Sequence, residues 1–217
     1  MRTGIITTTA LCVAAGTVAA GPTWVPDDWY SPGYGSDVSS SAGSDYQFDN
    51  FNAFGIYFAR ARDSDGSSRT MLDWNASGAH SEFDVVANSA GYNEGVTFIS
   101  FTAVTGGEFE MSLHFEFQGS GAGYMEVLMA IQERDGAYHE FNDYRDSPGS
   151  VSTSYSGTLV AGKQYWVGML VQAIGGFVGT GAGSGDMTLS VVPLPSASAL
   201  AGLGLLGLGV RRRRGSL

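Results

Sequence analysis

Apolar and polar residues alternate with a period of two along the middle of this chain. The clearest run is 108–118, where apolar residues stand at every second position: Phe109, Met111, Leu113, Phe115 and Phe117. Successive side chains of a β-strand point to opposite faces, so the run predicts a strand with one face in a core and one in water. An antiparallel sheet that is solvated on one side explains this pattern.

Similar runs recur through the rest of the middle region, and turn residues lie between them. Asp135-Gly136 predicts a tight hairpin, Asp65-Gly66 predicts another turn, and the glycine-rich stretch 175–185 predicts a flexible loop before the last strand. About ten strands in one chain predict an all-β fold, a two-sheet antiparallel β-sandwich of jelly-roll type. The other expected strands are 46–60, 69–74, 81–87, 96–104, 124–133, 137–141, 153–160, 165–174 and 187–192.

Composition supports a single β domain over residues 21–190. The chain has 217 residues and 32 glycines, and 43% of its residues are hydrophobic. Glycine costs about 1 kcal/mol relative to alanine inside a helix, so long helices are disfavoured. The apolar content excludes a disordered polar chain.

The charge is concentrated in that middle region. All 21 acidic residues lie within 27–186, against six basic residues there, and the whole chain carries a formal net charge of −10. So acidic a surface repels phosphate backbones, which argues against a nucleic-acid partner. It suits a soluble extracellular domain.

The N-terminus has the pattern of a secretory signal peptide over residues 1–20. A single positive charge at Arg2 precedes an apolar stretch, and Val18-Ala19-Ala20 offers small residues to a signal peptidase. We expect a signal helix and cleavage between Ala20 and Gly21. The alternative is a buried N-terminal helix, which the abrupt change at Gly21-Pro22 disfavours.

The C-terminus, residues 191–217, has three consecutive parts. Val192-Pro193-Leu194-Pro195 ends the domain, residues 196–210 are uncharged and apolar, and four arginines follow, Arg211, Arg212, Arg213 and Arg214. As a helix the apolar part is about 22 Å long, short for a hydrocarbon core of about 30 Å. Marginal spanning is feasible if the bilayer thins, with the arginines on the cytoplasmic side.

This order of parts resembles the PEP-CTERM sorting signal of Gram-negative bacteria, which combines a Pro-Glu-Pro motif, a short apolar helix and an arginine cluster. Here Leu194 stands where the family usually has Glu. The resemblance implies processing by an exosortase, a membrane transpeptidase-like enzyme, and transient anchoring in the inner membrane. It also implies a place at the cell surface or in the exopolysaccharide matrix. A plain C-terminal membrane anchor is the alternative.

Candidate catalytic and metal sites are weak in this sequence. Asp63-Ser64-Asp65-Gly66 resembles the start of a calcium loop but lacks the EF-hand glycine and glutamate at positions six and twelve. Calcium could instead lie between loops, and no cofactor is otherwise implied. The lone cysteine, Cys12, falls in the signal, so the mature chain has no thiol. The remaining candidates match no defined motif: calcium-loop acids Asp27, Asp28, Asp45 and Asp49; histidines His80, His114 and His139; carboxylates Glu133, Asp135, Glu140, Asp143 and Asp146.

Aromatic residues near the start of the domain suggest a binding role. Trp24, Trp29, Tyr30 and Tyr34 lie among Pro, Gly and Asp. Exposed Trp and Tyr rings stack on sugar rings, so these four are the predicted glycan-stacking residues. The alternative is that they latch the N-terminal segment onto the sandwich by burying their rings. Tyr138, Tyr144 and Tyr155 are open to both interpretations.

Three functions fit these observations. The first is a non-enzymatic surface or matrix protein with a structural or adhesive role, whose partners are a signal peptidase, an exosortase and the inner membrane. The second is an extracellular carbohydrate-binding module, with exopolysaccharide as its partner. The third is a glycoside hydrolase, for which the sequence offers only its scattered carboxylates.

Overall fold

The computed structural model describes residues 24–27, 29, 32–40, 43–88, 91–176 and 179–193. The predicted signal helix and the predicted apolar helix at 196–210 lie outside these residues. The described chain forms thirteen strands: β1 (Trp24–Pro26), β2 (Gly33–Ser40), β3 (Gly43–Asn50), β4 (Gly55–Arg62), β5 (Gly66–Trp74), β6 (Gly78–Asn88), β7 (Tyr92–Ala103), β8 (Gly107–Phe117), β9 (Tyr124–Glu133), β10 (Tyr138–Arg145), β11 (Gly149–Leu159), β12 (Gln164–Ile174) and β13 (Thr180–Pro193).

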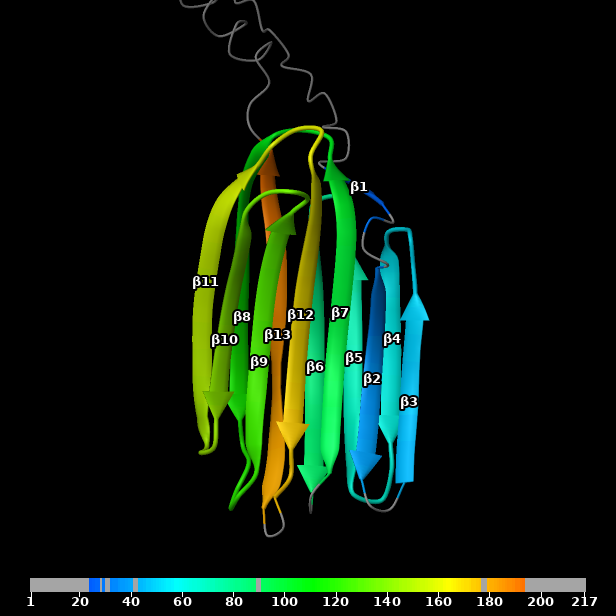
Figure 1. Ribbon diagram of the computed structural model, residues 1–217, viewed down its shortest axis with the longest axis vertical. Coiled ribbons are helices and arrows are strands. Elements are labelled where there is room, and N and C mark those ends of the chain that lie inside the picture. The colour runs from blue at the N-terminus through cyan, green and yellow to red at the C-terminus, as the bar shows by residue number, and fades with distance from the viewer. Residues whose placement is uncertain are drawn as a thin grey trace, which may run out of the picture.

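The strands form two antiparallel sheets that lie face to face, which confirms the predicted sandwich (Figure 1). Sheet I has the order β10-β9-β12-β7-β2-β3, with β1 paired to β7. Sheet II has the order β11-β8-β13-β6-β5-β4. The chain crosses between the sheets at both edges, from β3 to β4 on one side and from β10 to β11 on the other.

The core lies between the sheets and is built from the inward-facing side of each strand. In β8 the predicted apolar set is 5% exposed or less, while Glu108, Glu110 and Glu116 are exposed. Across the sandwich, β8 faces β9 of sheet I, while β7 and β12 lie over β5, β6 and β13. The largest fully buried side chains include Trp24, Leu72, Trp74, Ile99, Phe101, Leu113, Phe115, Met125, Met169 and Met187.

The expected strand 46–60 is wrong as a single element. It divides into β3 and β4, which belong to different sheets. Between them Phe51 turns inward, 8% exposed, and its backbone N–H donates to the Pro32 carbonyl at 3.1 Å. Phe51 and Phe54 both pack edge-on against Trp74, with ring centroids 5.5 Å and 5.2 Å away. Apolar packing across the open end of the sandwich therefore bends a segment whose alternation alone predicts one straight strand.

The expected flexible loop at 175–185 is also wrong over its second half, because β13 begins at Thr180. Its glycines lie where side chains from elsewhere fill the space. A Cβ at Gly183 would lie 2.4 Å from the sulfur of Met125 in sheet I, and one at Gly185 would lie 2.6 Å from the Phe115 ring. These glycines are thus strand residues that admit large neighbours into the core.

Candidate functional site

The outer faces of the two sheets differ in chemistry. On sheet II the outward side chains are mainly hydroxyl-bearing or charged, and every outward residue of β11 is Ser or Thr (Ser150, Ser152, Ser154, Ser156 and Thr158). On sheet I aromatic and aliphatic side chains face outward from five strands. We call this set the ring face: Tyr46, Phe48, Tyr92, Phe98, Tyr124, Leu128, Tyr138, Tyr144, Trp166, Leu170 and Ile174.

The ring face follows from strands that are apolar on both sides. In β12, inward Tyr165, Val167 and Met169 alternate with outward Trp166 and Leu170. A strand at a simple protein–water boundary needs only one apolar side, as β8 shows. The second apolar side leaves a wide hydrophobic and aromatic surface in contact with solvent, and such surfaces mark interaction sites.

Two rings, from β12 and β7, form the part of the ring face near the start of β12. Trp166 of β12 and Phe98 of β7 are stacked, with centroids 5.6 Å apart and planes 21° apart. Trp166 lies over Gly168, where a Cβ would come within 2.6 Å of the indole carbon Cη2. The glycine therefore lets the indole lie down on its own strand.

Phe48 of β3 extends the aromatic surface toward the sheet edge. Its ring covers β2, where a Cβ at Gly33 or Gly35 would come within 2.5 Å or 2.6 Å of the ring. Tyr46, which is 64% exposed, stacks beside it at 6.3 Å with planes 8° apart. Small residues in the strands thus place flat rings on the sheet in both regions.

A row of hydrogen-bonding groups runs across the strands, six residues along β12 from Trp166, with Tyr46 beside one end and Tyr144 beside the other. Glu126, Gln172, Glu94 and Asp37 stand opposite one another in the register of β9, β12, β7 and β2. Gln172 donates to Glu94 at 2.7 Å, and Asn142 donates to Glu126 at 2.7 Å. We call these four residues the polar row. They offer carboxylate and amide groups next to an aromatic surface.

Burial raises the pKa of Asp37, and the Glu94 carboxylate across the strand pair adds to that effect. Tyr92 donates its hydroxyl to Glu94, and its pKa is raised first by burial and then by this bond. The Tyr92 hydroxyl therefore stays protonated near neutral pH.

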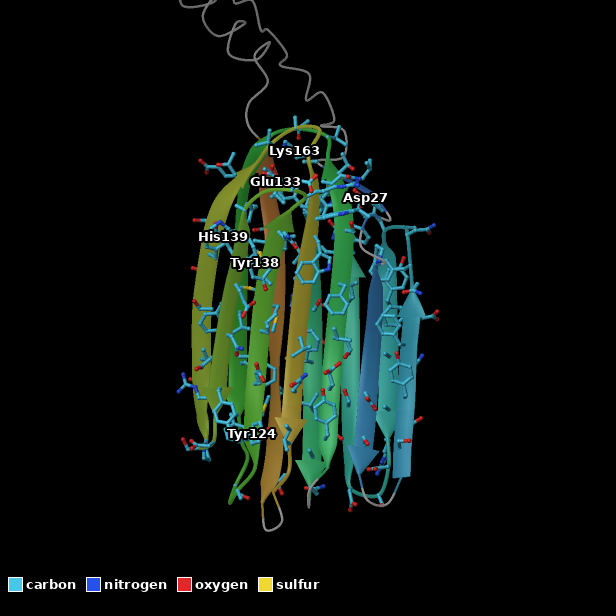
Figure 2. The ribbon with its side chains drawn as sticks, viewed as in Figure 1. Asp27, Tyr124, Glu133, Tyr138, His139 and Lys163 are labelled. Atoms are coloured by element: carbon cyan, nitrogen blue, oxygen red, sulfur yellow. The ribbon has the colours of Figure 1, made fainter. Side chains whose placement is uncertain are left out.

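Tyrosines also line the β10 side of the ring face. Tyr124 and Tyr138 lie near opposite ends of sheet I (Figure 2). Tyr124 packs on Tyr144 with centroids 4.7 Å apart, and Tyr144 is 54% exposed. Tyr138 donates to Glu140, and this hydrogen bond is the main reason that its pKa rises to about 12.

The structure disperses the four predicted glycan-stacking residues. Trp24 is fully buried and Tyr34 is 8% exposed, so both belong to the core and neither presents a ring to solvent. The Trp24 indole donates to the Asn75 carbonyl at 2.7 Å and packs 4.3 Å from Phe101. Trp29 is half-buried under the Arg134 guanidinium, 5.6 Å from its ring centre. Tyr30 lies outside the described residues. Trp24 and Tyr34 therefore pack the domain rather than form a platform.

Asp27 holds the first strand to sheet I, near one end of the sandwich (Figure 2). Its carboxylate accepts hydrogen bonds from Ser100 at 2.5 Å and Thr102 at 2.8 Å. Its backbone N–H donates to the Ser100 carbonyl at 3.0 Å. Its carboxylate is thus committed to protein donors.

Several of the other candidate acids have protein partners, and Asp28 lies outside the described residues. Glu133 pairs with Lys163 at 3.0 Å, and Asp143 pairs with Arg145 at 2.7 Å. Asp63 accepts from the Asp65 N–H at 2.8 Å, which fits a turn. Asp45 accepts from the Arg62 N–H at 2.8 Å. Among the described residues no three His, Cys, Asp or Glu side chains are grouped closely enough to hold a metal ion.

The three histidines occupy separate places. His80 and His114 lie on the outer face of sheet II, where they contact Thr188 and Ser152 respectively. His139 stacks on Tyr155, 4.6 Å away, at the mouth of a groove of about 220 Å³ between the edge strands β10 and β11. The floor of that groove is apolar, formed by Met111, Met129 and Ile131.

The last strand carries the chain directly into the predicted sorting tail. β13 is paired with β8 as far as Pro193, and the Pro-Leu-Pro sequence begins at that residue. Residues 191–214 match the family model of the PEP-CTERM protein-sorting motif. The predicted resemblance to this sorting signal is thereby confirmed. The PEP-CTERM motif implies an exported protein that an exosortase sorts, at the surface or outside the cell.

The PEP-CTERM motif covers only the C-terminal part of the chain. Within the part that the structure describes, no helix is long and apolar enough to cross a membrane. The arginine cluster, Leu194, Pro195 and the cleavage site at Ala20 and Gly21 lie outside that part, so their predicted roles stay predictions.

Comparison with other proteins gives few relatives for the domain. No curated protein matches the sequence. Among solved structures, TmCBM61 in complex with β-1,4-galactotriose aligns with 6% identity, a TM-score of 0.31, 64% of this chain and 88% of that one. The enzymatically active domain of tailspike protein 4 from bacteriophage CBA120 aligns with 8% identity, a TM-score of 0.31, 63% of this chain and 19% of that one. Similarities this low carry no functional argument.

Proposed function

We propose that this chain is a non-enzymatic protein of the cell surface or extracellular matrix, and that its ring face binds a polysaccharide. The observation that carries the proposal is the pairing of flat, half-exposed rings with the polar row on one sheet. Aromatic rings pack against the C–H faces of sugars, and carboxylate and amide groups accept or donate hydrogen bonds to sugar hydroxyls. The same surface therefore offers contacts both to the C–H groups and to the hydroxyl groups of a sugar.

The arrangement favours a chain of sugars that runs across the strands. Neighbouring strands lie about 4.8 Å apart, so rings on β12 and β7 offer adjacent sites to successive sugars. Trp166 and Phe98, 5.6 Å apart, are such a pair. The polar row crosses the strands in the same direction, since its members oppose one another in the register. The row lies six residues, about 20 Å, along β12 from Trp166. A polymer on the row would meet Tyr46 and Tyr144, whereas one on Trp166 and Phe98 would follow a parallel track across the strands.

Charge narrows the class of polymer. Arg134 lies at one end of this face, where it donates to Gln164 at 2.5 Å. The outward charged groups along the strands themselves are carboxylates: Asp37, Glu94, Glu126 and Glu140. They repel a polymer rich in uronic acids, and the repulsion falls with added salt. The proposed ligand is therefore an uncharged polysaccharide.

Replacing Trp166 by Ala tests this proposal. We expect at least about a tenfold loss of affinity for an uncharged matrix polysaccharide, since a central aromatic contact contributes about 1.4 kcal/mol or more. Affinity electrophoresis of the exported domain measures it, with uncharged and uronic-acid polymers from the producing cells compared. Tyr144→Ala on the same face should weaken binding as well.

Phe58→Ala is the matched control, because Phe58 is 53% exposed on β4 of sheet II. It should bind like the unaltered domain. Thermal unfolding verifies that each variant remains folded. Equal affinity of all variants would contradict a role for the ring face. Release of new reducing ends from the polymer would contradict a non-enzymatic role.

A further inference from the structure

The first residues of the PEP-CTERM motif are part of the folded domain. The match begins at residue 191, whereas β13 continues to Pro193. Val191 stands opposite Phe109 of β8, Val192 opposite Glu108, and Pro193 opposite Gly107. Three residues of the sorting signal are therefore also residues of sheet II.

Few contacts hold this end of the strand. On the other side of β13, pairing with β6 stops at Ser190, which stands opposite Gly78. Beyond it the Val191 N–H donates to the Ser77 carbonyl at 3.1 Å, and the Val191 side chain is 6% exposed. Pro193 has no N–H to donate to the sheet. Beyond Ser190 the strand is thus paired with β8 alone, and the Val191 N–H adds one bond to the β5–β6 turn.

The described chain begins and ends at the same end of the sandwich (Figure 1). Trp24 stands opposite Ala103 at the end of β7, and Pro193 stands opposite Gly107 at the start of β8. The turn between β5 and β6 touches both, because Asn75 accepts from Trp24 and Ser77 accepts from Val191. This end is therefore the part of the domain that meets a membrane-bound processing enzyme.

We propose that the exosortase can read the motif only after the last three residues of β13 have separated from β8. An enzyme that encloses this segment needs its backbone, and the same backbone groups cannot remain paired within sheet II. Ends of strands open at a small fraction of the free energy of global unfolding, so such separation is accessible in a folded domain. The sandwich then sets the rate of processing through the stability of one strand end. This inference rests on the sorting motif and not on polysaccharide binding.

A disulfide across the strand end tests the proposal. The double variant Val192→Cys, Glu108→Cys places two cysteines opposite each other, and the only natural cysteine, Cys12, lies in the predicted signal. Opposed residues in a sheet lie within the Cα separation that a disulfide bridges. We expect the oxidised variant, incubated with membranes that contain the exosortase, to be processed at least about tenfold more slowly than the unaltered chain. Mass spectrometry of samples taken over time measures the rate. Addition of a reductant should raise the rate to that of the Val192→Cys single variant, which carries the same change in the motif without the disulfide.

The matched control is Ser184→Cys, Glu116→Cys, which joins the same two strands at exposed positions far from the end. It should be processed at the unaltered rate in both redox states. Val191→Gly, which removes the buried side chain, should be processed faster. Processing of the end-locked form at the unaltered rate, or equal slowing of both locked forms, would overturn the proposal.

Discussion

Replacing Phe101 by Ala is expected to lower the free energy of unfolding of the domain by about 3–5 kcal/mol. Phe101 of β7 is fully buried, and its ring packs 4.3 Å from Trp24 and 5.7 Å from Tyr165. Truncation leaves a cavity that β7, paired on both sides with β12 and β2, cannot close. It also removes the ring contact between Phe101 and Trp24 of β1. Urea unfolding of the exported domain, followed by tryptophan fluorescence, measures the effect.

Phe58→Ala makes the same chemical change at a site that is 53% exposed, so it should alter stability by no more than about 0.5 kcal/mol. Similar losses for the two variants would contradict the placement of Phe101 in the core.

Replacing both Pro193 and Pro195 by Ala is expected to abolish sorting. These prolines define the first part of the PEP-CTERM motif, and the arginine cluster closes it. We expect the unaltered chain to reach a mature mass lower than that of the exported precursor, while the variant remains at precursor mass in the membrane fraction. Fractionation with intact-mass measurement of each fraction gives the result.

The fold of the variant should be unaffected, because Pro193 lies at the last position of β13 and alanine is compatible with a strand end. Thermal unfolding of the domain serves as the control. Unchanged release and an unchanged mature mass would contradict the assignment of these residues to the processing signal. Restoring Pro193 alone separates its role from that of Pro195.

Alternation identified the sandwich because most of its strands need only one apolar side. The sequence alone predicts which residues of β8 point inward, such as Phe and Leu, and which point outward, such as Glu. Glycine misled the prediction at β13, because composition does not distinguish a flexible loop from a strand that admits Met125 and Phe115 beside it. Similarly, the bend at Phe51 depends on packing against Trp74 from a distant segment.

The candidate site was harder to predict, because a ring's exposure depends on strand pairing. Trp24 stands among Pro, Gly and Asp residues, yet β1 pairs with β7 and its ring enters the core. Trp166 stands in an apolar strand, yet it occupies one of the alternate positions of β12 whose side chains point outward. One signal was present: adjacent apolar residues at 165–167 and 169–171 break the alternation that a half-wet strand requires. That break indicates a second apolar surface on sheet I.

The most direct test of the ring face is hydroxyl-radical footprinting of the exported domain, with and without the uncharged matrix polysaccharide. We expect oxidation of Trp166, Phe98, Tyr124 and Tyr144 to fall when polymer is added, whereas oxidation of Phe58 and His114 of sheet II should be unaffected. Protection confined to sheet II, or no protection on either sheet at saturating polymer, would contradict the proposed binding by the ring face.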